Sequence, residues 1–108
     1  MVVLDHEPHW WFLLQDHDAF LLDIHCSHGP VDYDWTMALN DDEVAQFRAT
    51  GRTFINSLAK NVQWTAPGAR GSSSPYLGRN LDAGMRQRVS TTIMEWRNDH
   101  AGELVGRA

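Results

Sequence analysis

The sequence of 108 residues contains a single cysteine and no long apolar run. With Cys26 alone, no internal disulfide can form. No stretch approaches the roughly 18 apolar residues that a membrane-spanning helix requires. The first residues also lack the basic start and the apolar centre of a secretory signal. We therefore expect a cytoplasmic protein that makes no contact with a membrane.

Motifs that carry chemistry are equally scarce. Nothing resembles the paired ligand spacing of a zinc finger, a nucleophile elbow or a P-loop. His25 and Cys26 are neighbours on a predicted strand, so they point to opposite faces and cannot bind one ion together. His25, Asp23 and Asp34 could together form a metal site on the outer face of the sheet. We prefer the alternative interpretation, in which His25 pairs with Asp32 across the strands. We expect no cofactor, no metal and no catalytic residue, and we interpret Cys26 as a buried structural thiol.

Basic residues are almost missing from the first half of the chain. Residues 1–50 hold ten acidic residues against one basic residue, Arg48, a net charge of −9. Residues 51–108 hold four acidic residues against eight basic ones, a net charge of +4. We expect the two halves to attract each other within the fold and one face to stay acidic. Such a face would repel nucleic acid and would suit a basic protein.

The length and the five tryptophans favour one folded domain with one core. We expect this domain to occupy residues 1–100 and residues 101–108 to form a frayed C-terminal tail. Residues 65–80 are rich in glycine, proline and serine. Connections of this length are commonly either functional or mobile.

Three strands are predicted over residues 9–14, 19–26 and 31–39. Turn signals separate them at residues 15–18 and 27–30. The alternation from Val31 to Leu39 is the strongest strand signal in the chain. Residues 1–8 could add a short edge strand or form a loose arm. The pattern therefore predicts an antiparallel meander of three strands, or of four if the N-terminal residues join it.

Two helices are predicted to follow the strands. Asn40 and Glu43 form the signature of a capping box, and an apolar stripe then runs from Val44 to Val62. Gly51 interrupts this stripe, and we interpret it as a close approach of the helix to the sheet, with a kink as the alternative. A second stripe runs over residues 81–98. We expect both helices to pack on one face of the sheet, giving a two-layer α+β sandwich with the order β-β-β-α-α.

Hairpin loops of two residues would set the strand registers. A loop at His17 and Asp18 places Phe12 opposite Asp23 and Leu14 opposite Leu21. A loop at His28 and Gly29 places His25 opposite Asp32 and Asp23 opposite Asp34.

This pairing predicts an unusual outer face. A contiguous apolar patch would lie beside a group of carboxylates, and a monomer rarely leaves such a patch in water. Residues 1–8, the tail, a second copy of the chain or another protein could cover it. The residues predicted to bind a partner are Trp10, Phe12, Leu14, Leu21, Asp23, His25, Asp32 and Asp34.

The leading hypothesis is a non-enzymatic module that binds a basic protein through this outer face, with Trp10 and Phe12 as anchors. Bacterial immunity proteins that neutralise basic toxins share this general profile of size and charge, which is an analogy of class. One alternative is a small enzyme or anion-binding domain that uses the 65–80 loop. Its residues would be Arg70, Ser73 and Arg79, with His28 nearby. Another alternative is a homodimeric structural subunit joined through the same sheet face.

Overall fold

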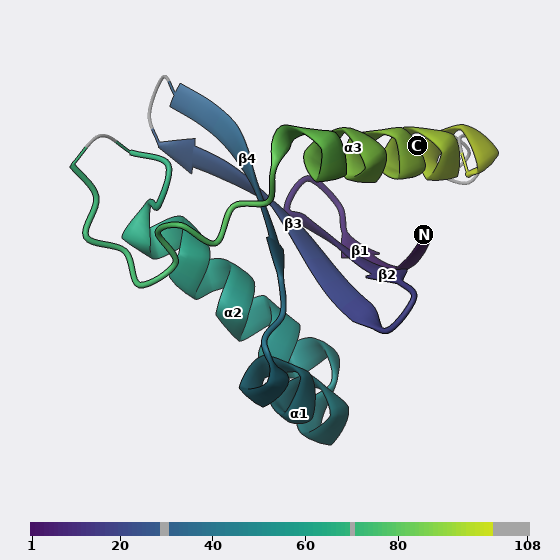
Figure 1. Cartoon of the computed structure of the whole chain (residues 1–108), viewed down its shortest axis with the longest axis horizontal. Coiled ribbons are helices and arrows are strands. Elements are labelled where there is room, and N and C mark those ends of the chain that lie inside the picture. The colour runs from purple at the N-terminus through teal and green to yellow at the C-terminus, as the bar shows by residue number, and fades with distance from the viewer. Residues whose placement is uncertain (29–30, 70, 101–108) are drawn as a thin grey trace.

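The computed structural model describes residues 1–28, 31–69 and 71–100, so the predicted tail lies outside the described residues. The elements, in chain order, are β1 (Val2–Glu7), β2 (Trp11–Asp16), β3 (Ala19–His28), β4 (Val31–Ala38), α1 (Asp41–Thr50), α2 (Arg52–Thr65) and α3 (Ala83–Asp99). The strands form one antiparallel sheet in the order β1-β2-β3-β4 (Figure 1). The α+β class is confirmed. The described part of the chain has the optional edge strand, and three helices where two were predicted.

The first predicted helix is divided at Gly51. Its start is as predicted, because Asn40 and Glu43 form a capping box with hydrogen bonds of 2.9 and 2.8 Å. Gly51 has a φ of 65°, a left-handed conformation that ends α1 and lets the chain turn into α2. A Cβ built at Gly51 would meet nothing within 4 Å. The glycine is therefore needed for its backbone conformation. The preferred interpretation, a close approach to the sheet, is wrong, and the alternative of a kink is correct.

The first hairpin has the predicted register, with Phe12 opposite Asp23 and Leu14 opposite Leu21. The second differs by two residues. His25 lies opposite Asp34, and Asp23 lies opposite Thr36. The predicted register is wrong because β3 continues through His28, so the strand is longer than the turn signal suggested. A shift of two residues keeps every side chain on its predicted face.

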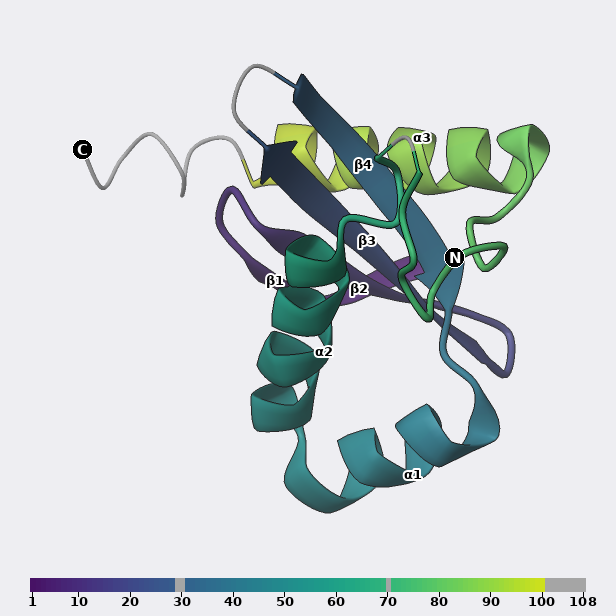
Figure 2. The same cartoon turned by 90° about the vertical axis from the view of Figure 1, so that its left-hand side faces the viewer.

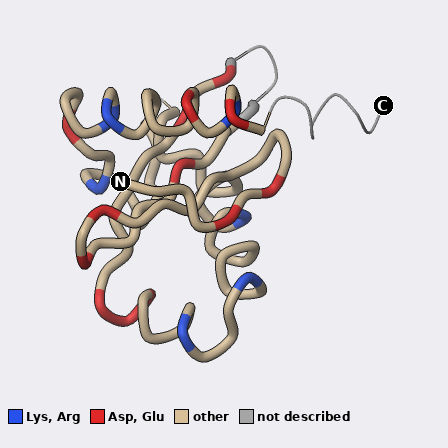
Figure 3. Tube along the Cα trace, turned by 90° about the vertical axis from the view of Figure 1, so that its right-hand side faces the viewer, with Lys and Arg blue, Asp and Glu red and all other residues tan. Residues whose placement is uncertain are grey.

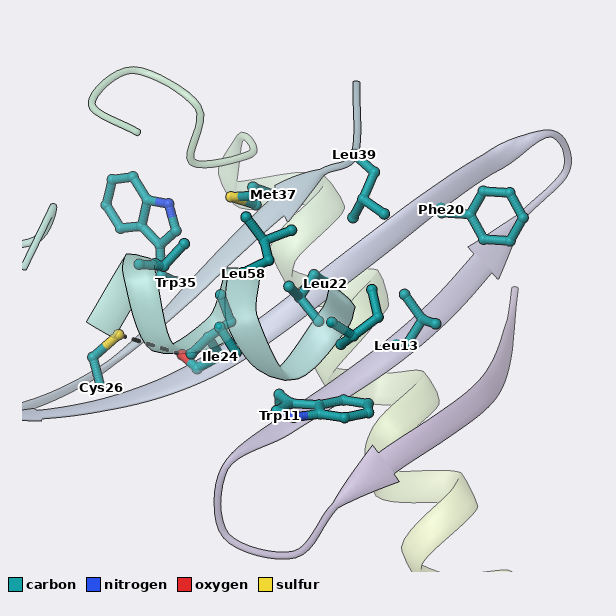
Figure 4. Close-up of a cluster of buried hydrophobic side chains, with 13 residues drawn as sticks. Trp11, Leu13, Phe20, Leu22, Ile24, Cys26, Trp35, Met37, Leu39 and Leu58 are labelled. Carbon is teal, nitrogen blue, oxygen red and sulfur yellow. Dashed lines mark hydrogen bonds between the residues drawn. The ribbon is translucent and has the colours of Figure 1, made fainter. Parts of the chain in front are cut away.

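The inner face of the sheet packs mainly against α2. Ile55, Leu58, Ala59 and Val62 of the helix are buried against side chains from β2, β3 and β4. Figure 4 shows Leu58 lying among these strand residues. The strand residues in this cluster are Trp11, Leu13, Phe20, Leu22, Ile24, Cys26, Trp35 and Met37.

The outer face is covered by α3, and this corrects the predicted two-layer packing. Figures 1 and 2 show α2 and α3 on opposite faces of the sheet. Val89 and Ile93 of α3 are buried against Phe12, Leu14 and Leu21 of the sheet. Because β2 is apolar on both faces, each face has to be removed from water. One helix cannot cover both, and the second predicted stripe supplies the missing layer. None of the described helices is long and apolar enough to cross a bilayer.

The long connection between α2 and α3 carries the chain from one face of the sheet to the other. Beside the edge strand β4, the Leu81 amide donates to the Thr36 carbonyl at 2.8 Å, and the Thr36 amide donates to Asn80 Oδ1 at 3.2 Å. Earlier in the connection, Gly68 lies against the ring of Tyr33, where a Cβ would approach to 2.5 Å. The segment therefore supplies hydrogen-bond partners to part of the backbone at the β4 edge, which explains its length.

The two oppositely charged halves of the chain pair as predicted. Arg52 binds Asp5 and Glu7, and Arg88 lies 3.4 Å from Asp16. Arg79 makes a further pair with Glu43. Figure 3 shows the basic positions on the helices and their connection, and many of the acidic positions on the strands and turns. These pairs neutralise part of the acidic excess and leave other carboxylates available on the surface.

Truncation of Ile93 tests the docking of α3 on the outer face. Ile93 is 5% exposed, whereas its neighbour Met94 is 65% exposed. We expect Ile93→Ala to lower the free energy of unfolding by about 2–4 kcal/mol, because it removes buried apolar volume. Met94→Ala should change it by less than about 0.5 kcal/mol. Urea denaturation measures both, and equal effects would contradict the packing of α3.

Candidate functional site: a pocket between the sheet and α3

A pocket of about 450 Å³ opens where α3 crosses the outer face of the sheet. One wall comes from the β1–β2 turn and the strands, and the other comes from α3. The pocket combines aromatic side chains with titratable groups of both signs. Its lining residues are His9, Trp10, Phe12, Asp23, His25, Asp34, Ser90, Ile93, Met94 and Arg97.

Asp23 is the most perturbed acid of this pocket. Its Oδ1 accepts a hydrogen bond of 2.6 Å from the Thr36 hydroxyl across the strand pair. Burial raises the pKa of Asp23 to about 6, against the lowering effect of that hydrogen bond. Within the described residues, no lysine or arginine forms an ion pair with Asp23. Asp23 is therefore a largely desolvated carboxyl group, and Arg97 and His25 offset only part of the cost of its negative charge.

His25 and Asp34 form a second polar unit at the mouth of the pocket. His25 Nδ1 lies 3.2 Å from Asp34 Oδ1 across the β3–β4 pair. Both side chains are exposed, with 46% and 64% of their surface accessible. The strand register brings them together in place of the predicted pair of His25 with Asp32. The carboxylate can therefore orient the imidazole while both groups remain accessible to a ligand.

Aromatic rings form the apolar part of the pocket. Phe12 packs edge-on against Trp96 with ring centroids 5.5 Å apart, and the guanidinium of Arg97 lies 5.1 Å from the Phe12 centroid. Trp10 is half-buried, and its Nε1 atom has no hydrogen-bond partner among the described residues. Its backbone carbonyl accepts from the His25 amide at 2.7 Å, which places Trp10 beside the polar unit. The pocket therefore places aromatic rings next to carboxylates.

The structure brings five of the eight predicted partner-binding residues into one pocket: Trp10, Phe12, Asp23, His25 and Asp34. Leu14 and Leu21 are buried under α3, so their predicted role on an open patch is wrong. Asp32 is exposed on β4 but is not among the lining residues.

Sequence reasoning missed the contribution of α3 to the site. Ser90, Ile93, Met94 and Arg97 complete the pocket. A signal was present, because the second amphipathic stripe and the outer apolar patch each needed a partner surface. Matching these two surfaces would have placed Arg97 above Phe12.

The alternative anion site on the 65–80 loop does not form around Arg79. The guanidinium of Arg79 binds both carboxylate oxygens of Glu43, at 2.5 and 2.9 Å, and the Ala38 carbonyl at 2.8 Å. Ser73 is exposed, Arg70 lies outside the described residues, and of His28 only the backbone in β3 is described. Arg79 therefore anchors the connection to α1 and β4, and its fork of donors is already occupied.

Cys26 is the buried thiol that was predicted. It is 0% exposed in the inner core, and burial raises its pKa to about 11. The reactive thiolate is therefore scarce at neutral pH. In the part of the chain that the structure describes, no three His, Cys, Asp or Glu residues are grouped so that they could hold a metal ion.

The Asp23→Asn variant tests the burial of Asp23. The folded-state pKa of about 6 lies above the ordinary value of 3.8. Well below pH 3.8 the group is protonated in both states, and as the pH rises the unfolded state ionises first. Wild-type stability should therefore fall towards pH 7, by up to about 3 kcal/mol relative to the variant. Urea denaturation across this range measures the difference.

The exposed Asp18 provides the matched control for this measurement. Asp18→Asn should leave the pH dependence of the free energy of unfolding unchanged. A difference between wild type and Asp23→Asn that does not grow between pH 4 and pH 7 would contradict the burial of the Asp23 carboxylate.

Glu43→Gln tests the structural role of the Arg79 pair. Burial favours the neutral form of Glu43, but the hydrogen bonds from Arg79 and the Asn40 backbone outweigh it and lower the pKa of Glu43. Its stabilisation is therefore present above the ordinary pKa and is lost as the pH falls through the folded-state pKa. At pH 7 we expect Glu43→Gln to cost about 2 kcal/mol, because Arg79 loses its anion. Asp42→Asn, at an exposed position of the same helical turn, should cost less than about 0.5 kcal/mol in the same denaturation measurement.

Neither the folded core nor the Arg79 pair identifies a reaction, so the pocket is the feature from which a function can be inferred. The pocket joins two carboxyl groups, an oriented imidazole, a guanidinium and two aromatic walls. Comparisons with family models, curated proteins and solved structures find no match for this chain.

Proposed function

We propose that this protein is a small acidic binding module that engages a basic protein through the pocket and its acidic rim. The observation that carries the proposal is the Asp23 carboxyl group, which is desolvated at the pocket and accepts its hydrogen bond from the neutral Thr36 hydroxyl, without a direct lysine or arginine ion pair among the described residues. A desolvated carboxylate without a directly bound counter-charge is unfavourable, and a basic partner would reduce that penalty.

The rim extends the same charge to the protein surface. Asp32 and Asp34 on β4 are exposed, and neither forms an ion pair with a described lysine or arginine. Surface carboxylates of this kind accelerate the encounter with a basic partner. Aromatic residues at the centre of an interface then provide most of the affinity. Trp10 and Phe12 would supply this part, although Phe12 is only 7% exposed and contributes mainly as a wall.

A bacterial immunity protein that neutralises a basic toxin is the biological role we favour for such a module. Its support is the small size, the net charge of −5 and the acidic pocket. Because α3 buries Leu14 and Leu21, we favour a different protein bound at the pocket over a homodimer joined through the sheet face. A cytoplasmic location is part of this proposal.

A small enzyme remains the second candidate, on a different site from the one predicted. The pair of His25 with Asp34 orients an imidazole, and Asp23 has a pKa of about 6, near the range useful for proton transfer. Turnover of a substrate that is lost in both His25→Gln and Asp23→Asn would favour this candidate over the binding module.

Charge reversal on the rim tests the binding proposal. A basic protein partner is first isolated on the immobilised wild-type chain. We expect Asp34→Lys to raise the dissociation constant for this partner at least about tenfold, since it replaces an attraction by a repulsion. Calorimetry or surface plasmon resonance measures the constant at low and high salt, and the wild-type affinity should fall as salt rises.

Asp18→Lys supplies the matched control, because it makes the same charge change in the exposed β2–β3 turn outside the pocket. We expect this variant to change the dissociation constant by less than about threefold. If Asp34→Lys folds normally, as judged by circular dichroism, and binds as tightly as wild type, the proposed function is wrong.

A further inference from the structure

The pocket already contains a guanidinium on an aromatic face. Arg97 of α3 lies with its central carbon 5.1 Å from the centroid of the Phe12 ring, a cation–π contact. Arg97 is exposed and forms no ion pair with a described carboxylate. The guanidinium therefore contacts the ring and also attracts the nearby Asp23 carboxylate, without a direct ion pair.

The carboxylates of the pocket have more negative charge than Arg97 balances. Asp23 accepts a hydrogen bond from the neutral Thr36 hydroxyl, and Asp34 pairs with the His25 imidazole. Both acids line the same pocket as Phe12. A second cation placed between them would gain two charge-assisted contacts.

Resting on the proposed function, we propose that the pocket receives one arginine side chain of the basic partner, with its guanidinium between Asp23 and Asp34 and beside Phe12. The pocket volume of about 450 Å³ is sufficient for such a side chain. Trp10 lines the same pocket and adds a second aromatic wall.

Arginine fits this site better than lysine for a physical reason. A guanidinium is planar, donates in two directions at once and stacks on aromatic rings, whereas an ammonium group is compact and strongly hydrated. Two carboxylates from neighbouring strands and a ring from β2 match the planar group. The contact of Arg97 with Phe12 shows that this ring accepts a guanidinium.

The charged groups that surround Asp23 make arginine binding depend on pH. Asp34 and Thr36 face it from β4, His25 is close to it on β3, Arg97 faces it from α3, and His9 lines the pocket from the β1–β2 turn. As the pH falls through the Asp23 pKa of about 6, Asp23 becomes neutral. This change disfavours a bound guanidinium, so arginine binding should weaken between pH 7.5 and pH 5.

The test uses a short blocked peptide, acetyl-Gly-Arg-Gly-amide, as the probe of the full chain in a two-dimensional NMR titration at pH 7.5. The matched control peptide contains citrulline, which has the shape of arginine without its charge. We expect saturable shifts of the Asp23, His25, Asp34 and Arg97 amides with the arginine peptide, and at least fivefold weaker binding of the citrulline peptide.

Variants of the protein give the second arm of the test. Asp23→Asn should weaken binding of the arginine peptide at least fivefold and should reduce its pH dependence. Arg97→Gln should strengthen binding about twofold to threefold, because it removes a competing cation. Arg86→Gln changes the same charge on α3 at an exposed position outside the pocket and should have no effect. The alternative is that the pocket binds an anion. In that case the acidic peptide acetyl-Gly-Glu-Gly-amide would bind, and Arg97→Gln would weaken its binding. That result overturns the inference.

The two proposals fail in different ways. Equal affinity for the arginine and citrulline peptides, or shifts confined to residues outside the pocket, overturns the arginine inference. If binding of the isolated partner still depends on Asp34 in that case, the acidic surface binds the partner without an arginine in the pocket. If the arginine peptide binds in the pocket while the partner is insensitive to Asp34→Lys, the binding-module proposal falls and the guanidinium site remains.

Discussion

The structure depends on the burial of a strand that is apolar on both faces. In β2, Trp11 and Leu13 point to one side of the sheet, and Phe12 and Leu14 point to the other. Neither face can be left in water at this density of large apolar groups. The chain therefore needs a helix on each face, and the connection between α2 and α3 has to pass the edge of β4. The hydrogen bonds of Asn80 and Leu81 to Thr36 hold that passage.

This requirement also creates the candidate site. α3 crosses the outer face to bury Val89 and Ile93, and its following turn carries Arg97 to the rim. At one end of the crossing the sheet surface changes from apolar side chains to Asp23, His25 and Asp34. The helix cannot pack tightly over these polar groups without leaving them unsatisfied. A pocket is left at the boundary, with aromatic and charged walls.

Much of the fold could be predicted from local patterns, and the errors have physical causes. The capping box of Asn40, the alternation of Val31 to Leu39 and the first hairpin register all depend on neighbours in sequence. The second register was wrong by two residues, because a turn signal at Ser27 and His28 competes with strand pairing that continues through them. The placement of α3 was wrong, because an amphipathic stripe specifies that a helix needs a surface but does not specify which face of the sheet supplies it. The predicted role of Arg79 failed for a similar reason, since its partner Glu43 lies 36 residues away in the chain.

Local patterns were enough to predict the α+β class, the faces of the strands, the helix start at Asn40, the buried thiol of Cys26 and the attraction between an acidic and a basic half. These properties follow from period, capping chemistry and composition, which are local or additive. Packing in three dimensions was needed to place α3 over Phe12, to bring His25 to Asp34 and to desolvate Asp23 beside Thr36. Those contacts depend on the register of a hairpin and on the side of the sheet to which a long connection leads. Both are set by the total apolar surface that the whole domain buries, and this total cannot be obtained from any single segment.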